Sequence, residues 1–170
     1  MEVNKLPEPW LRGTLAETRA VPRAVLHALE LAKEDLEHCC GPLSDAELNA
    51  RPAGIASVAF HLRHIARSID RLLTYAEAKQ LNAAQIAEMN SELDAGASHH
   101  ELFAEFELAL QNGMERIRAF DAGRLEEPRS VGKKELPTTL GGLLVHLAEH
   151  TQRHVGQAVT TSKLVLAKRS

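Results

Sequence analysis

The chain has 170 residues, of which 44% are hydrophobic and only 4% aromatic, and it carries 20 Lys and Arg against 23 Asp and Glu. This length suits one domain over residues 1–170, and a formal net charge of −3 without a dense basic segment argues against a nucleic-acid partner. Because the N-terminus lacks the apolar stretch of a signal peptide and no apolar run could span a bilayer, we expect a cytoplasmic protein without a membrane partner.

The first long element is a predicted helix over residues 15–40, where apolar residues recur at the spacing of one helix face. Gly41-Pro42 should end it, because proline cannot continue the hydrogen-bond ladder and glycine accepts the left-handed cap conformation. The adjacent cysteines Cys39 and Cys40 cannot join distant segments, so we expect both to be reduced, as small core residues at the helix end. Residues 1–14 should lie outside the bundle.

Three serine or asparagine residues each precede a glutamate or glutamine by three positions, which is the pattern of a capping box. They are Ser44, Asn82 and Ser98. The pattern predicts a short helical turn after Ser44, a short helix within a crossover over residues 80–97, and a long helix over residues 98–121.

Two further long helices complete the predicted architecture. An apolar stripe of alternating three- and four-residue steps predicts a helix over residues 57–79. Residues 122–137 are rich in glycine, proline and charge, which predicts a loop that leaves room for a short hairpin. After Pro137 we expect Thr138 to cap a last helix that runs nearly to the end of the chain. The fold class predicted is all-α, a four-helix bundle.

The last helix contains a pair of histidines on its predicted inward stripe, His150 and His154 within the segment HLAEHTQRHVGQ. Positions four residues apart lie about 6 Å apart on one helix face. Two imidazoles at that spacing can bind one metal ion at about 2.0–2.1 Å each. The pair is therefore a candidate metal site, for which a third ligand is needed.

The helix over residues 57–79 offers two candidates for that ligand, His61 and His64, beside its apolar stripe. We prefer His64, because it sits deeper in the helix, whereas His61 lies near the helix start and should be exposed to solvent. His146 should be either solvated or hydrogen-bonded within the core, and not a metal ligand. The remaining histidines are expected at the surface or as caps: His27, His38, His99 and His100.

A zinc protease is disfavoured, because the general-base glutamate that follows the first histidine in that motif is replaced by Thr151. Glu149 should instead pair with Arg153 at a spacing of four residues. No carboxylate partner for the histidines can be named from spacing.

Three arginines form a stripe next to the histidine face, at positions Arg63, Arg67 and Arg71. This stripe either pairs with acidic side chains on a solvated face or binds an anion. We expect Asp70 to lie nearer to Arg63 and Arg67 than to the histidines.

The combination of HIARSIDRLL with HLAEHTQRHVGQ, preceded by LPTTLGGLL, resembles the DinB/YfiT-like superfamily of metal-binding four-helix bundles over about residues 15–165. The family's three metal ligands map onto His64, His150 and His154. Val155 stands where the family often has arginine, so no role of that arginine carries over.

The resemblance implies an up-down-down-up bundle with a long crossover between helices two and three, a homodimer, and a divalent metal ion, with nickel or zinc as the leading candidates. It also implies a metal-dependent enzyme, a thiol S-transferase or a hydrolase, that activates a low-molecular-weight thiol or water toward a small electrophilic substrate. The alternatives are a non-catalytic metal-binding or stress-associated protein, and a plain bundle whose histidines hydrogen-bond to one another.

Overall fold

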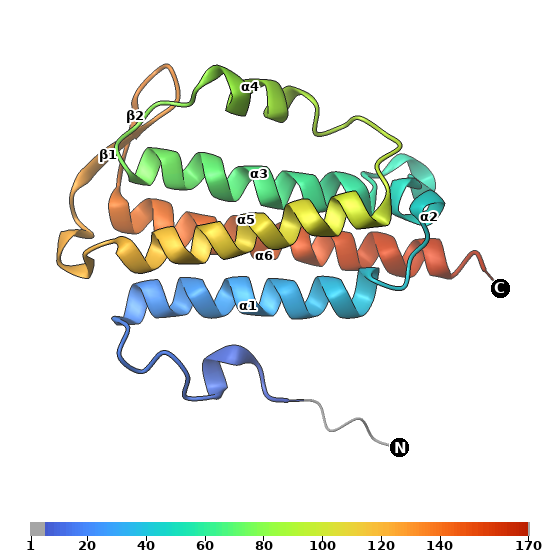
Figure 1. Cartoon of the computed structure of the whole chain (residues 1–170), viewed down its shortest axis with the longest axis horizontal. Coiled ribbons are helices and arrows are strands. Elements are labelled where there is room, and N and C mark those ends of the chain that lie inside the picture. The colour runs from blue at the N-terminus through green and yellow to red at the C-terminus, as the bar shows by residue number, and fades with distance from the viewer. Residues whose placement is uncertain (1–5, 170) are drawn as a thin grey trace.

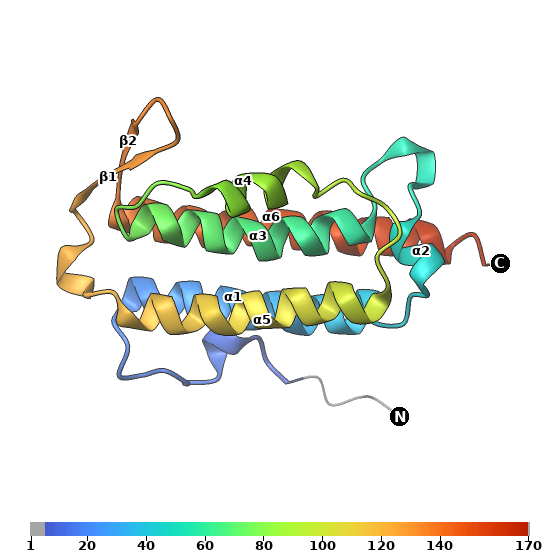
Figure 2. The same ribbon diagram turned by 45° about the horizontal axis from the view of Figure 1, so that its top comes forward.

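The computed structural model describes residues 6–169 and contains four long helices that lie side by side (Figure 1). Their bounds are α1 (Ala20–Cys40), α3 (Val58–Ala76), α5 (His99–Ala119) and α6 (Leu140–Leu166). Each of α1 and α3 packs against both α5 and α6, and Figure 2 shows the pair α3 and α6 above the pair α1 and α5. The colour ramp shows α3 and α5 running in one direction and α1 and α6 in the other. The expected all-α class is confirmed, with one small hairpin in addition.

The core between these helices consists mainly of aliphatic side chains, together with the aromatic rings of Tyr75 and Phe106. The periodic leucines and isoleucines of the sequence supply it, because a helix with an apolar stripe is stable only when that stripe is buried. The most completely buried large residues are Phe106, Leu26, Leu29, Leu36, Leu48, Leu62, Ile65, Ile69, Leu73, Leu102, Ile117 and Leu140. Cys40 belongs to the same core, and burial raises the pKa of its thiol to about 12. The two cysteines are not joined to each other or to any other described residue, as expected.

Short segments precede the first long helix and connect the others. The helices among them are α2 (Asp45–Asn49), α4 (Ala83–Asn90) and the 3₁₀ turns Pro9–Leu11, Pro52–Gly54 and Ala122–Arg124. The capping boxes at Ser44, Asn82 and Ser98 are all present, with each N-cap side chain accepting a hydrogen bond from the third helical amide. The crossover that contains α4 packs on α3. An antiparallel hairpin of β1 (Pro128–Val131) and β2 (Leu136–Thr139) precedes α6.

Three predicted details of the helix ends are wrong. The first helix begins at Ala20 and not at 15, because Leu15 has a φ of 57° and the chain turns there. Gly41 has a φ of −54°, outside the left-handed region, and its amide continues the helical hydrogen bonds to the carbonyls of Leu36 and Glu37. The N-cap of α6 is Thr139 and not Thr138, because strand β2 extends to Thr139, whose hydroxyl accepts a hydrogen bond from the Gly142 amide at 3.0 Å.

Within residues 6–169, no helix has the length and apolar character needed to cross a membrane.

Candidate metal centre

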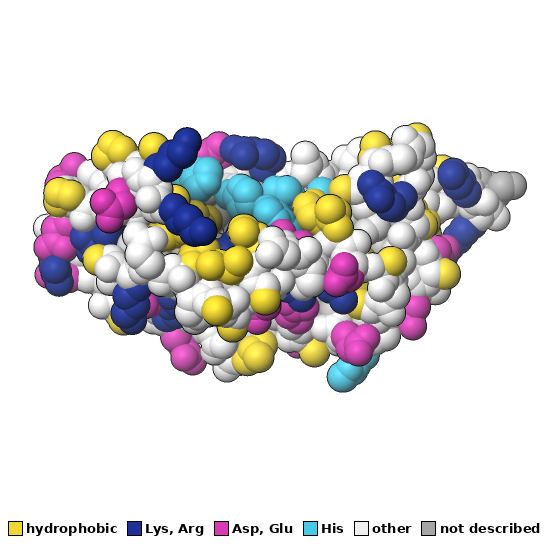
Figure 3. Space-filling model, turned by 90° about the horizontal axis from the view of Figure 1, so that it is seen from above, with side chains coloured by type: hydrophobic (Ala, Val, Ile, Leu, Met, Phe, Trp, Pro, Cys, Tyr) yellow, Lys and Arg dark blue, Asp and Glu magenta, His cyan; other side chains and the backbone are white. Residues whose placement is uncertain are grey.

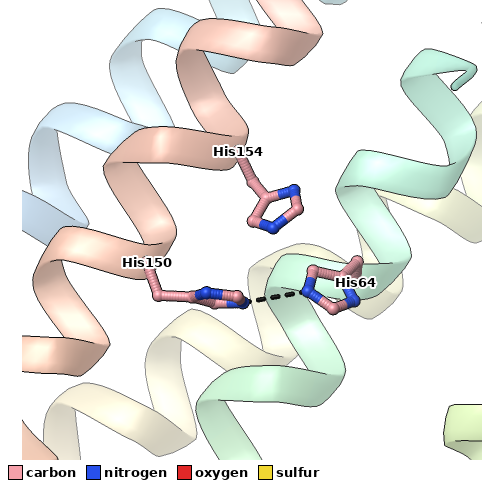
Figure 4. Close-up of side chains that lie close together, drawn as sticks. All are labelled: His64, His150 and His154. Atoms are coloured by element: carbon pink, nitrogen blue, oxygen red, sulfur yellow. Dashed lines mark hydrogen bonds between the residues drawn. The ribbon is translucent and has the colours of Figure 1, made fainter. Parts of the chain in front are cut away.

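Three histidines from two helices point toward a common centre (Figure 4). His64 projects from α3, and His150 and His154 project from α6, with ligand nitrogens that all lie within 4.8 Å of one another. Nε2 of His64 lies 2.9 Å from Nε2 of His150. Two nitrogens bound to one ion at about 2.0–2.1 Å lie about 3 Å apart at the usual bond angles. The structure thus brings together the three residues chosen from the sequence, in an arrangement that fits one ion, and metal binding by them stays a prediction.

The cluster lies at the edge of the α3–α6 seam and not in the bundle core where the sequence stripe put it. His150 and His154 are half-buried, whereas Thr151 and Val155, each one position further along α6, are buried. Figure 3 shows a group of His side chains on the face seen from above, with Arg and Lys side chains beside it. The site is therefore within reach of solvent and of a small molecule.

Burial keeps the two α6 histidines uncharged at neutral pH. Desolvation, with repulsion from His64, lowers the pKa of His150 to about 4 and that of His154 to about 3. A histidine must be neutral to offer a lone pair to a metal. The α6 pair is therefore in the ligating protonation state at pH 7.

A carboxylate that the sequence reasoning did not identify orients His64. Glu92 lies in the crossover, is 6% exposed, and accepts hydrogen bonds from Nδ1 of His64 at 2.7 Å and from Nη1 of Arg71 at 2.6 Å. Burial raises the pKa of Glu92, but the bonds from His64 and Arg71 outweigh it and lower the pKa below its usual value. Since Glu92 occupies Nδ1, Nε2 of His64 is the atom left for a metal, which is a common arrangement for ligating histidines.

The arginine stripe holds the crossover against α3. Nη1 of Arg63 donates to the carbonyl of Asp94 at 2.5 Å, and Nη1 of Arg67 donates to the carbonyl of Glu88 at 2.6 Å. Arg71 pairs with Glu92. These bonds within the chain favour the pairing alternative over anion binding.

Asp70 contacts side chains of α4 and α5. Its carboxylate accepts hydrogen bonds from Arg116 of α5 at 2.6 Å and from Gln85 of α4 at 2.5 Å. The expected pair of Glu149 and Arg153 is present on α6.

Two of the other histidines contradict the expectation that they are solvated. His61 is 4% exposed, and its Nδ1 lies 3.1 Å from Nδ1 of His154. His27 is 7% exposed and shares a hydrogen bond of 3.1 Å with the Thr14 hydroxyl. His99 contacts the Gly41 carbonyl through Nε2 at 2.9 Å, whereas His38, His100 and His146 are exposed as expected.

A groove of about 490 Å³ adjoins the cluster. Its lining includes Ile55, Phe60, His61, Arg153 and Thr160. The Phe60 ring stacks on the His64 ring at a centroid distance of 5.3 Å. Apolar, cationic and hydroxyl groups therefore surround a space next to the histidines that is large enough for a small molecule.

A search of curated proteins found no match to this chain. The sequence model of the DinB superfamily matches residues 28–158, which is more than half of the chain and includes His64, His150 and His154. The match and the three-histidine cluster together indicate binding of a divalent metal ion. By its sequence, the chain belongs to the DinB superfamily.

Proposed function

We propose that this protein is a metal-dependent enzyme that activates a low-molecular-weight thiol, or water, for attack on a small electrophilic substrate, by S-transfer or hydrolysis. The observation that carries the proposal is the set of three imidazoles that converge at a surface reachable by solvent. Three protein ligands leave at least one coordination position open, which is typical of catalytic sites and not of structural ones.

The donor set fits a divalent ion without selecting one. Imidazole nitrogens suit zinc, nickel, copper and iron alike, and nickel or zinc are our candidates on the basis of the family resemblance. When bound, the ion would supply a positive charge that lowers the pKa of a coordinated thiol or water.

The protein's own groups would orient this chemistry. Glu92 fixes the ring of His64, and α6 carries His150 and His154 one turn apart. The groove lined by Phe60, Arg153 and Thr160 supplies an apolar wall, a cation and a hydroxyl for a substrate that has both apolar and polar parts.

Cobalt substitution tests the open position directly. Protein produced without a histidine tag is loaded with Co²⁺ and titrated with mycothiol, bacillithiol or glutathione. We expect a thiolate-to-cobalt charge-transfer band with at least one of these thiols, and no such band in a His154→Ala variant. A cobalt spectrum that no thiol alters, combined with no exchangeable water on the ion, would favour the alternative of a non-catalytic metal-binding protein.

We also propose that the protein forms a homodimer, as the family resemblance implies. Large apolar side chains of the N-terminal segment support a contact surface there, since Leu6, Trp10 and Leu11 are all more than half exposed. Sedimentation equilibrium of the wild-type chain and of a Trp10→Ser variant tests this. We expect a dimer for the wild type and weaker association for the variant, whereas a wild-type monomer at all concentrations would exclude it.

A further inference from the structure

His61 contacts one of the three candidate ligands, although it is not a ligand in the proposed metal site. It lies on α3 three residues before His64, and its side chain is buried although it is polar. Its Nδ1 lies 3.1 Å from Nδ1 of His154. The two rings are tilted by 46°, with centroids 5.3 Å apart.

A contact between two ring nitrogens at this distance requires one donor and one acceptor. A histidine that ligates a metal uses one nitrogen for the ion and donates the N–H of the other to a neighbouring group. His154 meets His61 through Nδ1, so its Nε2 is the nitrogen left for an ion. His64 is arranged in the same way, with Glu92 at Nδ1.

We propose that His61 is a positioning residue, whose Nδ1 accepts the hydrogen bond from Nδ1–H of His154 and thereby holds His154 as an Nε2 ligand. His61 thus orients His154 on α6 as Glu92 orients His64 on α3. The proposal rests on metal binding by His64, His150 and His154, as proposed above.

The competing explanation is a buried histidine that serves only packing. The Phe60 ring does pack edge-on against His61 at a centroid distance of 5.2 Å. A packing role predicts that substitutions at this position change stability and leave metal affinity intact. A positioning role predicts that metal affinity depends on whether residue 61 has an acceptor atom within reach of Nδ1–H of His154.

Substitution of His61 by either of two amide residues, Asn or Gln, distinguishes these explanations. In His61→Asn, the side-chain oxygen can occupy the place of Nδ1 and accept the bond from His154. In His61→Gln, the oxygen lies near the place of Nε2 instead. His61→Leu removes the acceptor altogether, and His146→Leu is the matched control, because His146 is exposed on α6 beside His150 at a centroid distance of 5.5 Å.

The measurement is the Zn²⁺ affinity of each untagged variant, by competition with a chromophoric chelator, together with the spectrum of the Co²⁺ form. We expect His61→Leu and His61→Gln to lose about 10- to 100-fold in affinity. His61→Asn should stay within a few-fold of the wild type and His146→Leu should be unchanged. If His61→Leu fails to fold, the Asn and Gln variants decide.

Equal Zn²⁺ affinity and equal Co²⁺ spectra in the Asn and Gln variants and the wild type would overturn the role of His61 and leave the metal centre standing. A wild-type protein that binds no Zn²⁺, Ni²⁺ or Co²⁺ would overturn both the positioning role and the proposed function.

Discussion

At the scale of single residues, the burial of His150 and His154 makes stability depend on pH. The pKa of His150 is lowered to about 4 and that of His154 to about 3, whereas histidines in an unfolded chain have a pKa of about 6.5. Between these values the unfolded chain binds protons that the folded chain does not. The free energy of unfolding should therefore fall as the pH falls from about 6.5 toward 4.

The measurement is the Tm of the chelator-treated protein at pH 7 and at pH 5. We expect a Tm several degrees lower at pH 5. A His150→Gln, His154→Gln double variant is the control, because it lacks these two titrating groups and should lose less stability over the same range. Equal losses in the two proteins would contradict the assignment of the pH dependence to the histidines.

Glu92 gives a second prediction at this scale. Glu92→Gln removes the negative charge that His64 and Arg71 share as hydrogen-bond donors, so metal affinity should fall about tenfold or more. The half-buried Arg71 should also lose its ion-pair partner. Chelator competition measures the affinity and urea unfolding measures the stability. Glu88→Gln in the same segment, whose side chain is exposed, should change neither, and a Glu92→Gln protein with wild-type affinity would show that the carboxylate does not orient His64.

The residues of the centre differ in how far the sequence could predict them. His150 and His154 follow from helical spacing alone, because four residues along one helix determine their separation. Glu92 and the role of His61 depend on contacts between segments: Glu92 reaches His64 across the crossover, and His61 reaches His154 across the α3–α6 seam. No local pattern marks either contact.

At the scale of elements, Gly113 shows how closely α5 and α3 pack. A Cβ at this position would lie 2.6 Å from Cγ2 of Ile69, which is buried in the core. Gly113→Ala should therefore destabilise the protein by about 1–3 kcal/mol, even though alanine favours helix by about 1 kcal/mol over glycine. Gly156 on α6 is the matched control, because a Cβ there would meet open space.

Urea unfolding of both variants measures this difference. We expect Gly156→Ala to stabilise the protein by about 0.5–1 kcal/mol. Stabilisation of similar size in Gly113→Ala would mean that α3 and α5 do not approach as closely as described.

The helix boundaries also differ in how far the sequence could predict them. The capping boxes at Ser44, Asn82 and Ser98 were predictable because an N-cap bonds to an amide only three residues away. The N-cap of α6 was placed one residue too early, because the pairing of β2 with β1 keeps Thr138 and Thr139 extended. Strand pairing depends on residues outside any local window.

At the scale of the whole molecule, the packing of α3 against α6 brings His64 beside His150, which lies 86 positions away in the chain. The crossover covers one side of this seam and supplies Glu92, and the groove adjoins the cluster at Phe60 and His61. The region matched by the DinB superfamily model includes α3, the crossover with Glu92, and both candidate ligands on α6. The bundle therefore holds the three candidate ligands together and leaves the space beside them open.

A metal that binds only the folded chain must stabilise it, by about 4 kcal/mol at a free concentration 1,000 times the Kd. The most direct test of the central claim is calorimetric titration of untagged, metal-free protein with Zn²⁺ and with Ni²⁺, compared with the His154→Ala variant. We predict one ion bound per chain for at least one of these metals and loss of that binding in the variant. Absence of stoichiometric binding in the wild type, or equal binding by a variant that lacks His64, His150 and His154 together, would contradict the account.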